Sequence, residues 1–219
     1  MTATLGKRPL ALLALAVAAA GCAKTYSSSF PLDVGYQPLE ANEAAWPVGS
    51  ATDPTPQALG AAVTGHRDGH DYAHGRAYVH APLAKVWAAL QDPMTSRIHG
   101  PTVVVIPGAE PFPLTFTLKY TVKSIVGTVE WESAYRGGPV DGTVDAPLSV
   151  GVRYQEVLAN SYVRTQSGSL FAAPVDGAPD VTSIEFVTWL DATRSGPADA
   201  WGAVQDWFND IVAKVETLP

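Results

Sequence analysis

The sequence predicts an α+β domain in which a run of antiparallel strands precedes one long C-terminal helix. Residues 113–191 contain several stretches of alternating apolar and polar side chains, each bounded by Gly, Pro, Asn or Asp, and residues 197–218 carry apolar side chains at helical spacing. Alternation is typical of half-buried strands, whereas a 3.6-residue period is typical of an amphipathic helix. Helices kept apart from antiparallel strands define the α+β class.

The C-terminal helix has the clearest pattern in the chain. Ser195, Gly196 and Pro197 provide a start, and Asp199 falls in the first turn, where a carboxylate is favoured by the helix dipole. A helix of about 21 residues is roughly 30 Å long and needs an apolar surface of similar length to cover its stripe. The residues of that stripe are Trp201, Val204, Phe208, Ile211, Val212 and Val215.

About seven strands are predicted upstream of this helix. The first is followed by a short helix over 83–90, with apolar residues at i, i+3, i+4 and i+7, and by one more helical turn from Met94. The stretch 103–106 is expected to be a short buried strand, and 113–123 shows the cleanest alternation. The predicted strands cover 71–80, 103–106, 113–123, 125–135, 150–158, 161–172 and 181–191.

The first 21 residues have the features of an export signal. Lys7 and Arg8 precede an uncharged run over 10–20, which is too short to span a membrane. The ending Ala19-Ala20-Gly21-Cys22 resembles the lipobox of bacterial lipoproteins, which implies cleavage before Cys22 and acylation of its sulfur. Cys22 is the only cysteine, so lipidation also explains how an exported chain avoids a free thiol. Ala23 after this cysteine resembles a signal for the outer membrane, facing the periplasm.

Residues 22–66 are expected to be a tether rich in Pro, Ser and Gly, and residues 67–219 a single domain. An alternative is that part of this segment straps onto the domain, since it contains Phe30, Leu32, Tyr36, Leu39 and Trp46. Without residues 1–21 the chain has a net charge of −9. That charge argues against nucleic acid and against electrostatic binding to anionic lipid, and leaves the acylated Cys22 as the membrane contact.

A family resemblance is visible in residues 77–93, which read Ala-Tyr-Val-His-Ala-Pro-Leu-Ala-Lys-Val-Trp-Ala-Ala-Leu-Gln-Asp-Pro. This stretch resembles the opening of START-like (SRPBCC, helix-grip) domains, and the strand over 181–191 with its long final helix is similar to their ending. The resemblance covers about 70–219. It implies a curved antiparallel sheet wrapped around the last helix, with a cavity between them for an apolar small molecule or lipid. Some family members are polyketide cyclases or dehydratases.

The cavity implied by the family would be lined by large apolar residues of the strands and helices. For any single residue of this kind, a place in the core is the default alternative. Trp131, Trp189 and Trp201 share the same two alternatives. The predicted lining is Trp87, Phe116, Leu118, Tyr120, Tyr154, Phe186, Phe208 and Ile211.

No catalytic or cofactor motif is present, and neither a cofactor nor a metal is expected. Glu156, on the apolar face of its strand, and His99, in a loop near the expected cavity mouth, are weak candidates for acid–base work. His70, His74 and His80 lie on one face of a strand but too far apart to share one ion, so a polar, solvent-facing surface is expected there.

The sequence therefore predicts a lipid-anchored protein that binds an apolar molecule without converting it. Two alternatives remain open: a cyclase- or dehydratase-like enzyme, and a structural or interaction lipoprotein whose core is filled. A large cavity with a buried ionisable pair would favour the enzyme, an apolar cavity the binding protein, and a filled core the interaction protein.

Overall fold

A computed structural model describes residues 35–124, 127–159 and 162–219. Cys22, Phe30 and Leu32 lie outside the described residues. Eight antiparallel strands form one sheet in the order β1-β2-β8-β7-β6-β5-β4-β3. Their bounds are β1 Val63–Arg67, β2 His70–Val79, β3 Thr102–Pro107, β4 Leu114–Ser124, β5 Gly127–Gly142, β6 Pro147–Ala159, β7 Val163–Val175 and β8 Ala178–Ala192.

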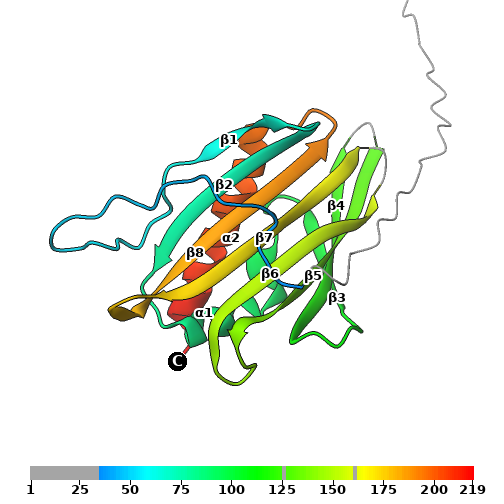
Figure 1. Cartoon of the computed structure of the whole chain (residues 1–219). Coiled ribbons are helices and arrows are strands. Elements are labelled where there is room, and N and C mark those ends of the chain that lie inside the picture. The colour runs from blue at the N-terminus through cyan, green and yellow to red at the C-terminus, as the bar shows by residue number, and fades with distance from the viewer. Residues whose placement is uncertain (1–34, 125–126, 160–161) are drawn as a thin grey trace, which may run out of the picture.

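Three helical segments of the described residues complete the fold: α1 (Leu83–Leu90), the 3₁₀ helix η2 (Pro93–Ser96) and the long α2 (Pro197–Thr217). α2 lies behind the sheet in Figure 1 and runs along the strands, with α1 near its C-terminal end. This is the α+β helix-grip architecture that the sequence predicts. No helix among the described residues is long and apolar enough to cross a membrane.

The inner face of the sheet, which faces α2, carries the core. α2 comes closest at β2, where a Cβ on Gly75 would lie 3.0 Å from side-chain atoms of both Trp201 and Val204. The glycine therefore allows the helix to pack on the strand. The largest fully buried side chains of the inner face and helices include Tyr120, Phe186, Leu90, Leu118, Leu170, Ile184 and Ile211.

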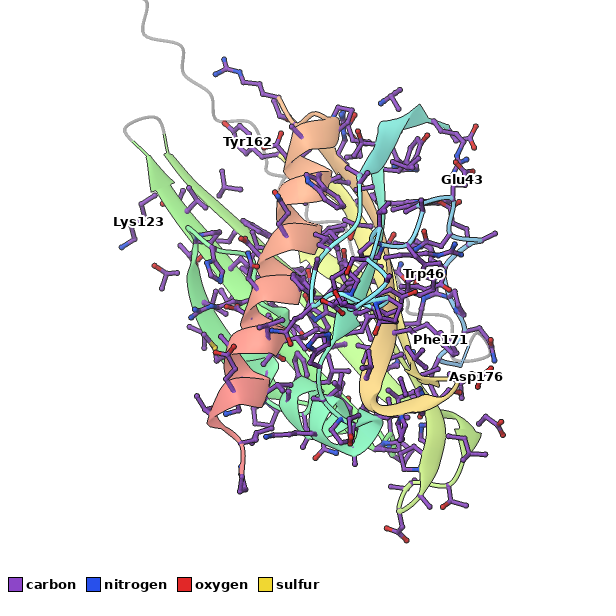
Figure 2. The ribbon with its side chains drawn as sticks, turned by 90° about the vertical axis from the view of Figure 1, so that its left-hand side faces the viewer. Glu43, Trp46, Lys123, Tyr162, Phe171 and Asp176 are labelled. Carbon is purple, nitrogen blue, oxygen red and sulfur yellow. The ribbon has the colours of Figure 1, made fainter. Side chains whose placement is uncertain are left out.

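A segment that we call the strap, residues 36–47, crosses the opposite, outer face of the sheet (Figure 1). The Leu39 backbone N–H donates to Ser169 Oγ at 2.8 Å, and the Asn42 side chain donates to the carbonyls of Gly75 and Phe186 at 3.1 and 2.9 Å. Figure 2 shows Glu43 and Trp46 on the side of the sheet away from α2. Part of the predicted tether is thus strapped onto the sheet.

Two further details differ from the sequence prediction. The sheet has eight strands instead of about seven. The additional strand is β1, which begins inside the predicted tether and ends one residue after the predicted end of the tether at residue 66. β3 is an exposed edge strand, so the prediction of a buried strand over 103–106 was wrong. Four consecutive apolar residues do not show by themselves whether a strand is central or at an edge.

Candidate functional site

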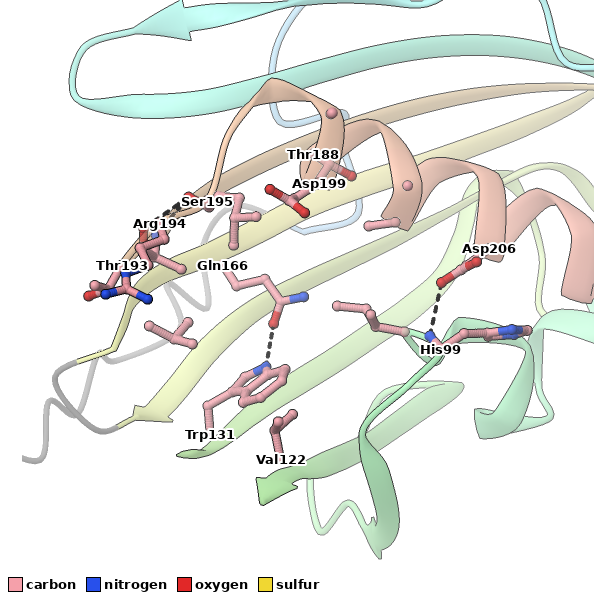
Figure 3. Close-up of a pocket in the computed structure, with 17 residues that line it drawn as sticks. His99, Val122, Trp131, Gln166, Thr188, Thr193, Arg194, Ser195, Asp199 and Asp206 are labelled. Atoms are coloured by element: carbon pink, nitrogen blue, oxygen red, sulfur yellow. Dashed lines mark hydrogen bonds between the residues drawn. The ribbon is translucent and has the colours of Figure 1, made fainter. Parts of the chain in front are cut away.

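A pocket of about 650 Å³ lies between the first turns of α2 and the inner face of the sheet (Figure 3). Its walls come from α2, from the strands β4, β5, β7 and β8, and from the loops before β3 and α2. Small side chains of α2 form one wall, and Trp131 and Gln166 lie opposite them on neighbouring parts of the sheet. Ligand pockets commonly occupy about 300–1,000 Å³, so this space can hold a small organic molecule.

The pocket exists because α2 carries small residues where it passes this part of the sheet. Ala198, Gly202 and Ala203 line it, and a Cβ built on Gly202 would meet no atom within 4 Å. One turn later, Trp207 and Phe208 are buried against the sheet and fill the same gap. The hollow thus ends where the helix side chains become bulky.

The floor of the pocket is rigidly held. Trp131 Nε1 donates to Gln166 Oε1 at 2.7 Å, and Ser133 Oγ donates to the same oxygen at 2.9 Å. The Trp131 ring also stacks on Tyr120, with 4.8 Å between centroids and 16° between planes. A ligand in the pocket would therefore meet a fixed aromatic surface with one amide beside it.

The rim of the pocket is polar. The His99 backbone N–H donates to Asp206 at 2.9 Å, and its Nε2 lies 2.9 Å from Asp210 (Figure 3 shows the Asp206 bond). Asp199 accepts from the N–H of Gly196 at 2.8 Å and so caps α2. Charged groups at the rim and apolar groups inside suit a molecule with an apolar body and a polar end.

The eight residues predicted to line the cavity are all buried, and none of them lines this pocket. They belong to the core, where an aromatic cluster fills the middle of the space between α2 and the sheet. Tyr135 stacks on Phe116 and Tyr154 at 4.8 and 5.2 Å, and Trp207 packs edge-on against Tyr154 at 5.6 Å. For these residues the alternative of a place in the core is the one found.

The tyrosines of this cluster are neutral hydrogen-bond donors. Tyr135 Oη donates to the Ser96 carbonyl at 3.0 Å, and Tyr154 Oη donates to Thr188 Oγ1 at 3.1 Å. Burial raises the pKa of Tyr120 to about 12 and also raises the pKa of both other hydroxyls. Their role is to fill the core next to the pocket.

The two candidates for acid–base work lie in different places. His99 is on the pocket wall, whereas Glu156 lies on β6, paired in register with Ser133, and is not part of the wall. Burial raises the pKa of Glu156 to about 7. The structure does not bring the two groups together on the pocket wall, so no acid–base pair of these two residues faces the space where a ligand would lie.

The face of β2 that carries the histidines was expected to face solvent, and for its central part this was wrong. His74 is fully buried under the strap, where its Nδ1 accepts from the Glu43 N–H at 3.0 Å and its Nε2 donates to Glu40 at 2.7 Å. Although burial opposes it, the bonds from Trp189 and His74 and the charge of Arg67 lower the pKa of Glu40. Among the described residues, no group of three or more His, Cys, Asp or Glu side chains could hold a metal.

The residues that form the pocket were not predicted from the sequence, apart from His99 and, as one of two alternatives, Trp131. The signal was present in α2: residues 198–203 read Ala-Asp-Ala-Trp-Gly-Ala, so small side chains recur on one side of the first turns. Gln166 had no such signal. A polar residue in a strand becomes part of a site only through the residues that surround it in the folded protein.

No protein-family model matches the sequence, and no curated protein matches it. Several solved structures do. The Zhui aromatase/cyclase of Streptomyces sp. R1128 is 14% identical, with 67% of this chain and 94% of that chain covered and a TM-score of 0.45. The lipid transfer and protein localization domain of human StarD13 is 11% identical, covering 72% and 90%, with a TM-score of 0.47. A START superfamily protein from Mycobacterium smegmatis is 14% identical, covering 69% and 100%, with a TM-score of 0.43.

The three structures share a START-like fold, and their names describe both an enzyme and a lipid transfer domain. Each TM-score lies below 0.5, so the function of this chain has to be inferred from its own geometry. That geometry defines an α+β helix-grip protein with a pocket beside the start of its last helix.

Proposed function

We propose that this protein is an outer-membrane lipoprotein, facing the periplasm, that binds a small amphipathic molecule without converting it. The observation that carries the binding function is the 650 Å³ pocket between the first turns of α2 and the sheet. Its apolar lining includes Trp131, Leu190 and Ala203, and its rim includes His99, Arg194 and Asp206. Such a site suits a lipid fragment or another apolar molecule with one polar end.

Filling the pocket tests this function. Gly202→Leu would place a side chain in the hollow, because nothing lies within 4 Å of a Cβ at this position. Gln205→Leu adds a leucine at an exposed position of the same helix and is the matched control. With a fluorescent fatty acid as probe, Gly202→Leu should weaken binding by at least about tenfold, and Gln205→Leu should bind as the wild type does. If wild type takes up no probe, the interaction protein becomes the better description.

The anchor is tested separately. Acylation of Cys22 is proposed from the Ala19-Ala20-Gly21-Cys22 sequence and from the lack of any other cysteine. Labelled palmitate should enter the wild type and not Cys22→Ser, and the wild type should fractionate with the outer membrane. Equal labelling of the two proteins would remove the anchor and leave the pocket as it is.

A cyclase- or dehydratase-like enzyme is the second candidate, and one observation favours it. His99 lies on the pocket wall with its Nε2 2.9 Å from Asp210, an arrangement in which a carboxylate orients an imidazole. Against it, Glu156 is not part of the pocket wall. His99→Gln should leave probe binding within about twofold of wild type if the imidazole only borders the site. Release of an altered molecule by wild type and not by His99→Gln would favour the enzyme.

A further inference from the structure

The two edges of the sheet differ in chemistry. β1, at one edge, has five residues and includes His66 and Arg67. Arg67 pairs with Glu40 at 2.8 Å and with Glu43 at 3.2 Å, so the strap ties this edge down with charge. Short strands and charged side chains are the usual devices that keep an edge from pairing with another chain. This edge is protected.

β3, at the other edge, has no such protection. Its sequence is Thr-Val-Val-Val-Ile-Pro, with no charge. Val104, Val105 and Ile106 are 55, 38 and 39% exposed. The pairing with β4 is regular from Thr102 to Pro107, without a bulge to twist the edge away. Within the described part of the chain β3 pairs with β4 alone, so its other row of N–H and C=O groups faces outward.

The chemistry of this edge selects the kind of partner. A lipid surface would cover the valines but would leave the outward backbone groups without hydrogen bonds, which is unfavourable. A strand satisfies both the backbone and the side chains. Since apolar groups stand on both faces of β3, the partner strand must be apolar on both faces and uncharged. β3 itself meets this requirement.

We propose that β3 is the interface through which two copies of this chain pair, antiparallel, across a two-fold axis perpendicular to the sheet. Such an axis keeps the inner faces of the two sheets on the same side. Two residues that lie opposite each other must then belong to the same face of β3, so their position numbers add up to an even number. With Val104 opposite its own copy, Val103 meets Val105 and Thr102 meets Ile106. This register leaves Pro107, which has no N–H to donate, outside these pairs.

The two copies do not repel each other at this contact. No charged side chain lies between Thr102 and Pro107, and the β4 residue opposite Val104 is Lys119, whose Nζ lies 3.9 Å from Glu130 and 4.0 Å from Glu132. The contact is small, since only five residues of each copy, Thr102 to Ile106, pair in this register. Chains held in one membrane by the proposed anchor would meet at a higher local concentration, which favours such a small interface.

Cross-linking tests both the contact and its register. Directly opposed residues of an antiparallel pair have Cα atoms about 4.5–5.5 Å apart, within the range of a disulfide. Full-length Val104→Cys, oxidised in its own membrane, should form a disulfide dimer at least tenfold more than Val48→Cys, a matched control at a position that is 95% exposed and lies outside β3. Wild type, whose only cysteine is Cys22, is the control for any disulfide formed through that residue. A mixture of Thr102→Cys and Ile106→Cys chains should cross-link more than either variant alone.

The outcomes separate the proposal from its alternatives. If Val104→Cys reacts with a maleimide but forms no more dimer than Val48→Cys, the proposal is overturned. A disulfide between Val104→Cys and a different protein would also overturn it. Val104→Lys, which puts two like charges opposite each other, should abolish the dimer seen by native mass spectrometry, whereas Val48→Lys should keep it. No residue of β3 lines the pocket, so Gly202→Leu should dimerise as wild type does.

Discussion

The two halves of α2 lie against the same sheet but have different structural roles. Over its first two turns the helix presents Ala198, Gly202 and Ala203, and a hollow of about 650 Å³ remains beneath them. From Trp207 onward it presents bulky side chains, and the core is filled. One helix therefore acts as a pocket wall at one end and as a core element at the other, and only the size of its side chains changes.

The sheet beneath the two halves differs as well. Under the hollow lie Trp131, Ser133 and Gln166, which bond to one another. Under the filled half lie Tyr135 and Tyr154, with other rings stacked against them. Polar groups held in a network remain ordered beside an open space, whereas apolar rings gain stability only in contact with other atoms. The site and the core are thus separated by residue type along the strands.

The largest effect is expected from truncation in the filled half. Trp207→Ala should lower the free energy of unfolding by about 3–5 kcal/mol, because the ring packs against Tyr135, Tyr154 and Phe186 and its loss leaves a cavity. Trp201→Ala, which removes a half-buried ring from the first half, should cost clearly less. Urea unfolding of both variants measures this. Equal losses would show that the two halves are equally packed.

A pH-dependent effect is expected under the hollow half. Burial raises the pKa of the Glu156 carboxyl from 4.5 to about 7 in the folded protein, so the folded state holds this proton more tightly than the unfolded state does. The stability linked to that proton is present below pH 4.5 and is lost as pH rises through 7. Glu156→Gln should therefore match wild type near pH 4 and be more stable at pH 8, by up to about 3 kcal/mol.

The control for this prediction is Glu216→Gln, which removes one carboxylate from an exposed position near the end of α2. Denaturation curves of the three proteins between about pH 4 and 8 separate local burial from overall charge. If wild type and Glu156→Gln show the same dependence on pH, the carboxyl is not desolvated and this end of the sheet is wetter than the structure indicates.

The smallest effect is expected at the glycine of the pocket wall. Gly202→Ala should raise stability by up to about 1 kcal/mol, since alanine is the better helix former and its Cβ meets no atom within 4 Å. Gly75→Ala should have the opposite sign, because its Cβ would lie 3.0 Å from Trp201 and Val204. A loss of stability in Gly202→Ala would mean that the hollow is closed in solution. Thermal unfolding of the pair is sufficient.

Much of the fold could be predicted because local patterns determine it. The period of α2 and the alternation in β4 show which side chains share a face. The alternation in β2 likewise predicted correctly that His74 and Ala73 lie on opposite faces of that strand. β1 was missed because five residues, four of them polar or glycine, carry little pattern of their own. The exposure of β3 was missed because an apolar run looks the same in a central strand and at an edge.

The location of the pocket was not predicted. Phe208 and Ile211 were expected in its wall because they are apolar and lie in the middle of the helix, but large apolar groups fill space and so mark the core. The pocket lies where side chains are small, and a small side chain forms a hollow only when nothing opposite reaches into it. Whether Trp131 or Gln166 does so depends on strands far apart in the chain.

By itself, the sequence determined the α+β class, the long final helix, the two faces of β2 and the candidate anchor at Cys22, since each depends on residues close together in the chain. The tertiary structure decided the burial of His74 beneath Glu40 and Glu43, the open edge at β3, and the hollow beneath Gly202. These three features depend on distances between segments that are about 30 or more residues apart or on the order of strands in the sheet. Periodicity contains no information about either, because it reports only which way a side chain points and not what it meets.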